Sequence, residues 1–246
     1  MSNFLDDIEH KKQLLMEATC KNKLDQILLS QNVTENFYNA FKHDQTFHKW
    51  LSEKLPELVE CERQQQNNPW HKYNVLGHIL HSVEEMNKQT EGMAQEERRK
   101  LAYVMLFHDI GKPATHITRQ KDGKTIDSFF GHNVKSCEIA QRRLPSFDFG
   151  MRELVQMSQL IYKHDIFMFI KDHPTNNPHW KQLSFQVLEK EIADLSQTGD
   201  GHELMRQLVM VGRADNLAQN EKMTAPSLAM LDKIDTMLDE MDREKE

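Results

Sequence analysis

The chain has 246 residues, a formal net charge of −7 and 13 histidines. Its 9 glycines and 7 prolines amount to about half of their average combined usage of about 12%. This shortage excludes collagen, flexible linker arrays and turn-dense all-β folds, which need both residues at their turns. The negative charge argues against a protein whose whole surface binds nucleic acid, because neutralising phosphates requires clustered lysine and arginine. The composition therefore indicates a helical protein with an unusual supply of metal ligands or proton carriers.

The cysteines and the apolar runs limit the cellular setting. Cys20, Cys61 and Cys137 are isolated in the sequence, so a zinc site built from C-x-x-C pairs is not expected. Scattered cysteines are typical of a reducing compartment. The first seven residues carry acids where a signal peptide would carry lysine or arginine. The longest apolar run, residues 101–107, is far shorter than a membrane span. We therefore expect a cytoplasmic protein with no membrane partner.

The predicted elements are helical along almost the whole chain. Residues 5–66 contain no glycine and a single proline, which predicts helix throughout this segment. A turn at residues 67–69 follows. The helix predicted over residues 95–109 is apolar on all sides in its second half, so we expect it to be buried at the centre. The other predicted helices cover residues 70–86, 129–144, the stripe within 154–161, 180–196, 202–219 and 226–242.

One segment breaks the helical pattern. Residues 117–126 surround the pair Asp122-Gly123, which is typical of the turn of a short β-ribbon. No internal repeat or low-complexity tract is present. The pattern predicts an all-α helical bundle with a small β-ribbon. We expect an N-terminal helical extension over residues 1–68 and a second domain over residues 69–246.

The pair His108-Asp109 lies at the end of the most apolar predicted helix, where Leu101, Met105 and His108 share one face. A buried carboxylate is costly unless it is paired or bound to a metal ion. Adjacent residues point about 100° apart on a regular helix, but at a helix end both side chains can turn towards one ion. The alternative is a polar helix end that faces water.

Asp215 continues a second apolar stripe, after Leu204 and Leu208. A carboxylate on the buried face of a helix requires a partner. A divalent cation is one candidate. A salt bridge to Arg206 or Arg213 is another, and a helix with a different phase is a third.

Three histidines occupy comparable positions. His164 ends the apolar stripe of its predicted helix, and His78 lies beside the stripe of another. His132 lies at a helix start, where the positive end of the helix dipole favours a neutral imidazole that can bind a metal. The alternatives are a hydrogen-bonded core histidine for His78 and a capping role for His132.

Taken in chain order, these residues form a recognisable motif. The set His78, His108-Asp109, His132, His164 and Asp215 resembles the HD superfamily of metal-dependent phosphohydrolases, whose motif is H…HD…D. The most specific local match is His108-Asp109-Ile110-Gly111-Lys112-Pro113, and the segments Val75-Leu76-Gly77-His78, Phe130-Gly131-His132 with Ser136, and Ala214-Asp215 fit around it. Over residues 70–220 the chain is most similar to the HD domain attached to bacterial CCA-adding tRNA nucleotidyltransferases. It has no Gly-Gly-x-x-Arg-Asp segment of a nucleotidyltransferase head and no H-x-x-E-R-x-D-G-x-G-Y-P stretch. The resemblance therefore implies neither CCA addition nor cyclic-di-GMP hydrolysis.

The resemblance implies a set of metal ligands. One ion is held by His78, His108, Asp109 and Asp215. In five-histidine-type variants a second ion is held by added histidines, here His132 and His164, with Asp109 bridging. Ligands of these kinds suit Fe, Mn, Ni, Co, Zn or Mg.

The resemblance also implies the chemistry. Asp109 and Lys112 are the candidate catalytic residues, and the Lys112 cation is a candidate to bind a phosphate oxygen of the substrate. The alternative for Lys112 is an ordinary cation at a helix C-terminus. His81, His116, Arg119 and Arg142 are further candidates to line the pocket.

The expected function is hydrolysis of phosphomono- or phosphodiesters by metal-activated water. The expected substrates are small nucleotides with 2′,3′-cyclic or 2′-phosphates, or an RNA end. Two alternatives remain: a di-iron oxygenase with the same ligand set, and a non-catalytic helical binding module with a structural metal ion. The sequence leaves the oligomeric state, the metal and the role of residues 1–66 open.

Overall fold

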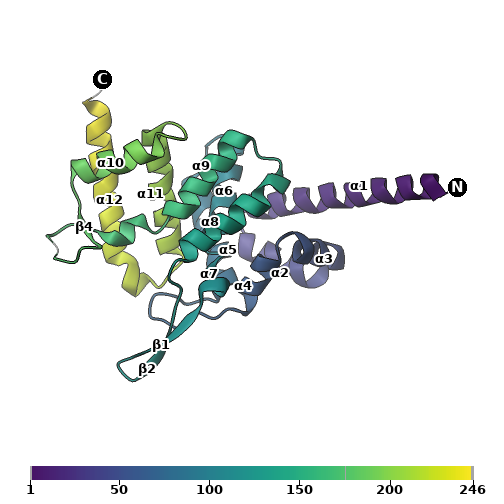
Figure 1. Cartoon of the computed structure of the whole chain (residues 1–246), viewed down its shortest axis with the longest axis horizontal. Coiled ribbons are helices and arrows are strands. Elements are labelled where there is room, and N and C mark those ends of the chain that lie inside the picture. Colours follow the sequence, from purple (N-terminus) through teal and green to yellow (C-terminus); the bar gives the residue numbers. More distant parts are fainter. Residues whose placement is uncertain (1, 175, 245–246) are drawn as a thin grey trace.

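The computed structural model describes residues 2–174 and 176–244, and these residues form an all-α bundle as predicted (Figure 1). Helix α1 (Ser2–Leu28) begins the chain, and its first half projects from the body (Figure 1). Helices α2 (Val33–His43), α3 (Gln45–Lys54) and α4 (Pro56–Arg63) follow. None of the helices described here is both long and apolar enough to cross a membrane.

The prediction of continuous helix over residues 5–66 is wrong at the breaks between these helices. Residues 29–32, 44, 55 and 64–66 are not helical. Asp44 ends α2 and caps α3, because its Oδ1 accepts a hydrogen bond from the Phe47 backbone N–H at 3.0 Å. Pro56 occupies the first turn of α4, where its missing N–H costs nothing.

Helix α6 (Gln95–His108) lies at the centre of the bundle. Every residue of α6 from position 100 to 108 is buried, which confirms the predicted central helix. Helix α6 packs against α5, α8, α9 and α11. The bundle helices are α5 (Val75–Gln89), α7 (Lys112–Thr115), α8 (His132–Arg143), α9 (Met151–Lys163), α10 (Phe185–Leu195), α11 (Gly201–Leu217) and α12 (Glu221–Arg243).

The N-terminal helices and the bundle share one hydrophobic core. Leu24, Phe37 and Trp50 belong to the same buried cluster as Tyr103 and Phe147. The Trp50 and Phe147 rings meet edge to face, with their centroids 6.3 Å apart. The domain boundary at residue 68 stays a prediction.

The predicted β-ribbon consists of β1 (Ile117–Lys121) and β2 (Lys124–Ser128), which pair antiparallel. Asp122 and Gly123 at its turn have φ values of 51° and 73°, as a tight hairpin turn requires. Asp127 ties the base of the ribbon to the bundle, because its Oδ2 accepts hydrogen bonds from the Asn67 backbone N–H at 2.8 Å and side-chain amide at 2.9 Å.

Several predicted boundaries shift in the structure. The helix expected from residue 70 begins at Val75, and the one expected from residue 180 begins at Phe185. The helix expected from residue 129 begins at His132, because Gly131 adopts a φ of 76°. The sequence pattern did not predict the short parallel pair of β3 (Ile170–Lys171) and β4 (Lys181–Gln182).

Candidate metal centre

Each of the six predicted ligands comes from a helix or a helix end of the bundle. His78 lies on α5 and Asp215 on α11. His108 is the last residue of α6, and Asp109 follows it with φ −111° and ψ 4°. This departure from helical geometry lets neighbouring side chains reach the same point, as expected for a helix end. His132 begins α8 and His164 follows α9.

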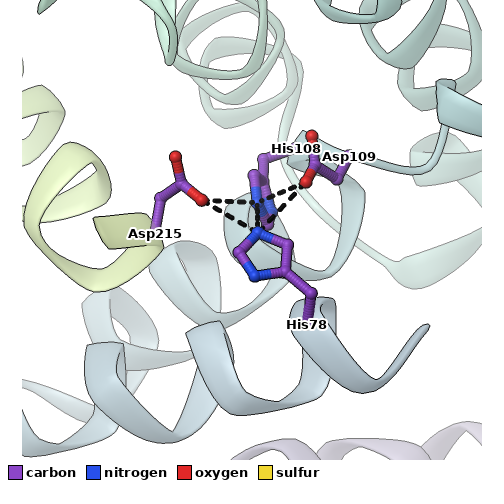
Figure 2. Close-up of side chains that lie close together, drawn as sticks. All are labelled: His78, His108, Asp109 and Asp215. Atoms are coloured by element: carbon purple, nitrogen blue, oxygen red, sulfur yellow. Dashed lines mark hydrogen bonds and ion pairs between the residues drawn. The ribbon is translucent and has the colours of Figure 1, made fainter. Parts of the chain in front are cut away.

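Four of the predicted ligands form one cluster, which we call the inner group (His78, His108, Asp109 and Asp215; Figure 2). The His78 Nε2 atom lies 2.9 Å from Asp215 Oδ1 and 3.1 Å from Asp109 Oδ2. The Nε2 atoms of His78 and His108 are 3.4 Å apart. One ligand atom from each residue lies within 4.8 Å of all the others, so a single ion could contact all four.

A second cluster, the outer group (Asp109, His132 and His164), adjoins the first. The His132 Nε2 atom lies 3.1 Å from Asp109 Oδ1 and 3.1 Å from His164 Nε2. The His164 Nε2 atom lies 3.7 Å from the same Asp109 oxygen. Asp109 therefore presents Oδ2 to the inner group and Oδ1 to the outer group.

Backbone carbonyls orient three of the four histidines. The Nδ1 atoms of His108, His132 and His164 lie 2.6, 2.8 and 2.7 Å from the carbonyl oxygens of the residues three positions earlier. A carbonyl oxygen only accepts hydrogen bonds, so Nδ1 carries the proton in each ring. Each Nε2 atom then directs its lone pair towards the cluster in the neutral ring, which is the arrangement of metal-binding histidines.

The charges of the inner group require a cation. Burial raises the pKa of Asp109, but Lys112 and His108 outweigh burial and hold that pKa well below its usual range. Burial likewise opposes ionisation of Asp215, but His108 and His78 hold its pKa well below normal. Burial lowers the pKa of His108, but Asp109 and Asp215 raise it to about 10. Two ionised carboxylates thus face one point, where a proton on His108 Nε2 or a divalent cation supplies positive charge.

The donor set fits a divalent metal. Imidazole nitrogens and carboxylate oxygens together suit Mn, Fe, Co, Ni and Zn. Arg206 and Arg213, the alternative partners of Asp215, instead pair with acids of α12. Asp215 contacts His78 and accepts a hydrogen bond from the Gln219 side chain at 3.0 Å. The salt-bridge alternative for Asp215 is therefore wrong.

Gly111 and Ser136 bring the two groups together. The Gly111 backbone N–H donates to Ser136 Oγ at 2.9 Å. A Cβ atom at Gly111 would lie 2.5 Å from the Ser136 backbone nitrogen and 2.7 Å from the His132 carbonyl oxygen. Only glycine therefore allows α8 to approach the end of α6 this closely, which sets the position of His132 beside Asp109.

Lys112 also contacts the inner group. Its Nζ atom lies 2.6 Å from Asp109 Oδ2, and the residue is 5% exposed. It begins the four-residue helix α7, three residues after the Asp109 cap of α6. The cation therefore faces the candidate metal ligands.

Asp165, which the sequence pattern did not predict as a ligand, also adjoins the outer group. Its Oδ2 atom lies 3.2 Å from His132 Nε2, and its Oδ1 atom lies 3.5 Å from His164 Nε2. A signal was present, because His164-Asp165 repeats the dipeptide His108-Asp109.

The four further pocket candidates make other contacts. His81 lies 2.9 Å from Glu84 of its own helix, and His116 lies 2.8 Å from Asp127 at the base of the ribbon. The Arg119 guanidinium lies over the Phe130 ring at 4.1 Å, and Arg142 pairs with Glu57. The structure places these side chains in contacts outside the inner and outer groups.

Comparison with known proteins identifies a family. The family model described as HD domain matches residues 71–217, which include all six predicted ligands. HD domains bind divalent metals and are generally metal-dependent phosphohydrolases. No curated protein matches the chain, and the finer resemblance to CCA-adding enzymes has no support from these comparisons. Because the match covers more than half of the sequence, this chain belongs to the HD domain family.

Proposed function

We propose that this protein is a phosphohydrolase that uses two divalent metal ions. One observation carries the proposal: Asp109 directs one carboxylate oxygen to the inner group and the other to the outer group. A carboxylate shared in this way is suited to bridging two ions. We infer that His78, His108 and Asp215 complete the first site, and that His132, His164 and Asp165 complete the second.

The ions and the residues supply different parts of the chemistry. Divalent cations lower the pKa of water to give a nucleophile at neutral pH and stabilise charge on phosphoryl oxygens. Asp109 holds the two sites at a fixed separation. Lys112 places a buried positive charge beside Asp109, where it can neutralise a phosphate oxygen as negative charge builds.

We propose a small phosphorylated substrate, namely a nucleotide with a 2′,3′-cyclic or 2′-phosphate, or an RNA end. Two observations support a substrate with a base. The Phe130 side chain is 66% exposed only two residues from His132, and the Arg119 guanidinium stacks on its ring. An exposed aromatic ring and a guanidinium can both stack on a nucleobase. The net charge of −7 favours a small substrate over long RNA.

Metal analysis of the purified protein followed by a phosphoester screen tests the proposal. We expect two equivalents of metal and anaerobic hydrolysis after addition of Mn²⁺ or Ni²⁺. Turnover that requires oxygen would support the di-iron oxygenase instead. One tightly bound ion with no hydrolysis of any ester would support the non-catalytic module.

A further inference from the structure

A second polar cluster lies against the inner group, on the segment between α4 and α5. Within the described part of the chain, three acceptors surround the Lys112 ammonium: Asp109 Oδ2 at 2.6 Å, Gln66 Oε1 at 2.9 Å and His71 Nε2 at 3.2 Å. Gln66 accepts a hydrogen bond from the ammonium, His71 Nε2 lies within hydrogen-bond distance of it, and Asp109 forms an ion pair with it. These contacts offset the cost of burying the charge, because Lys112 and Gln66 are each only 5% exposed.

The hydrogen bonds of Asn68 identify His71 as an acceptor. Asn68 Oδ1 accepts the backbone N–H groups of Trp70 at 3.1 Å and His71 at 3.2 Å, so this atom is the amide oxygen. The His71 Nδ1 atom lies 2.8 Å from the same oxygen and must therefore donate its proton to it. In this tautomer the His71 Nε2 atom has a lone pair, and that lone pair faces the Lys112 ammonium.

His71 lies beside the inner group, where a catalytic histidine could lie, but both of its ring nitrogens already have partners. Its ring centroid lies 5.2 Å from that of His78. Its Nδ1 proton is held by Asn68 Oδ1 at 2.8 Å, and its Nε2 atom lies 3.2 Å from the Lys112 Nζ atom. The ring therefore does not supply a proton to a leaving group, and its Nε2 lone pair is occupied by Lys112 rather than by a metal ion.

We propose that His71 is a positioning residue, oriented by Asn68, whose Nε2 acceptor fixes the Lys112 ammonium beside Asp109 before the substrate arrives. This inference rests on the proposed function, in which Lys112 neutralises a phosphate oxygen. A fixed charge needs no reorganisation during the reaction, which is the source of its catalytic value. Without the Nε2 acceptor, one ammonium proton loses its partner and the charge moves away from its position.

Three substitutions separate this acceptor from the bulk of the ring. His71→Phe retains a ring but removes both nitrogens. His71→Asn retains a donor for Asn68 but has no group at the Nε2 position, whereas His71→Gln places an amide oxygen near that position. We expect kcat on bis-p-nitrophenyl phosphate to fall about 10–100-fold in the Phe and Asn variants. This range is typical when a residue that supports a metal site without binding the metal is removed. We expect the Gln variant to recover most of that loss, with two metal equivalents in every variant.

A measurement independent of activity keeps the two proposals distinguishable. In the zinc-loaded protein, nitrogen-15 NMR should detect the ammonium of Lys112, identified by its absence in Lys112→Met, because buried and bonded protons exchange slowly. The signal should be lost in His71→Phe and His71→Asn and persist in His71→Gln. Wild-type protein that hydrolyses no phosphoester but shows this NMR pattern would contradict the proposed function and retain the positioning of Lys112. Unchanged ammonium signals and kcat in the folded Asn variant would overturn the inference.

Discussion

The inner and outer groups share Asp109 but differ in their access to water. In the inner group the most exposed side chain is Asp215, at 12%, and the His78 and His108 side chains are at most 1% exposed. The outer group opens through His132 and the adjoining Asp165, whose side chains are 14% and 18% exposed. In structural zinc sites protein ligands fill every coordination position, whereas catalytic zinc sites keep one position open to water or substrate. We infer that the inner ion anchors the centre and that the outer ion meets the substrate.

Asp109→Ala tests the shared element and should have the largest effect. We expect both ions to be lost. Hydrolysis should fall by more than about 10–100-fold, the loss typical when a residue that supports a metal ligand is removed. The metal-free variant should also lose about 3–5 kcal/mol of unfolding free energy, because the buried Lys112 ammonium loses its charged partner. Metal analysis and urea unfolding measure these changes.

Asp127→Ala provides a matched control for this variant. Asp127 is also a buried aspartate, but it pairs with His116 and Asn67 at the base of the ribbon. We expect this variant to retain two metal equivalents. Full metal content in Asp109→Ala would refute a shared ligand.

A chelator should separate the two groups. We expect competition with a chelator to remove the outer ion first, since that group is the more exposed, and to remove the inner ion in a slower phase. His132→Ala should abolish the fast phase and leave one equivalent, whereas His116→Ala, which changes a histidine outside the centre, should leave both phases. Loss of both ions in a single phase from the wild-type protein would remove the distinction between the groups.

Asp165→Ala tests the open side of the centre. We expect the affinity of the outer ion to fall by more than the about 10–100-fold typical of residues that only support a ligand, while the inner ion is unaffected. Asp172→Ala is the matched control, because Asp172 lies on the same segment but pairs with Lys233. Titration with Mn²⁺ measures both affinities. Equal affinities in the two variants would show that Asp165 is not a ligand.

Helical periodicity predicted those members of the inner and outer groups that lie on or at the end of a helix with an apolar stripe. His164 and Asp215 each continue an apolar stripe at a position that should be apolar, and this local conflict marks a functional side chain. Asp165, Gln66 and His71 lie outside regular helix, so no periodicity marks them. The contact of Lys112 with Gln66 joins residues 46 positions apart, and only the folded chain brings them together.

The fold shows the same limit. The buried α6 was predictable because its second half is apolar on all sides. The break at Asp44 was not predictable, because the residues around it are common in helices. The break depends on the Asp44 side chain, which caps α3. The pair of β3 and β4 has two residues in each strand, too few for an alternating pattern.

The last prediction concerns pH and compares the proton with the metal ion at the inner group. Asp109 and Asp215 raise the pKa of His108 from 6.5 to about 10, so the metal-free protein holds a proton there at pH 7. Binding of an ion at His108 must displace that proton, and affinity should rise about tenfold per pH unit between pH 6.5 and 9. Calorimetry in buffers of different ionisation enthalpy measures the release, for which we expect at least one proton per inner ion. Binding without proton release would show that His108 is already neutral, and the charge balance proposed for the inner group would then be wrong.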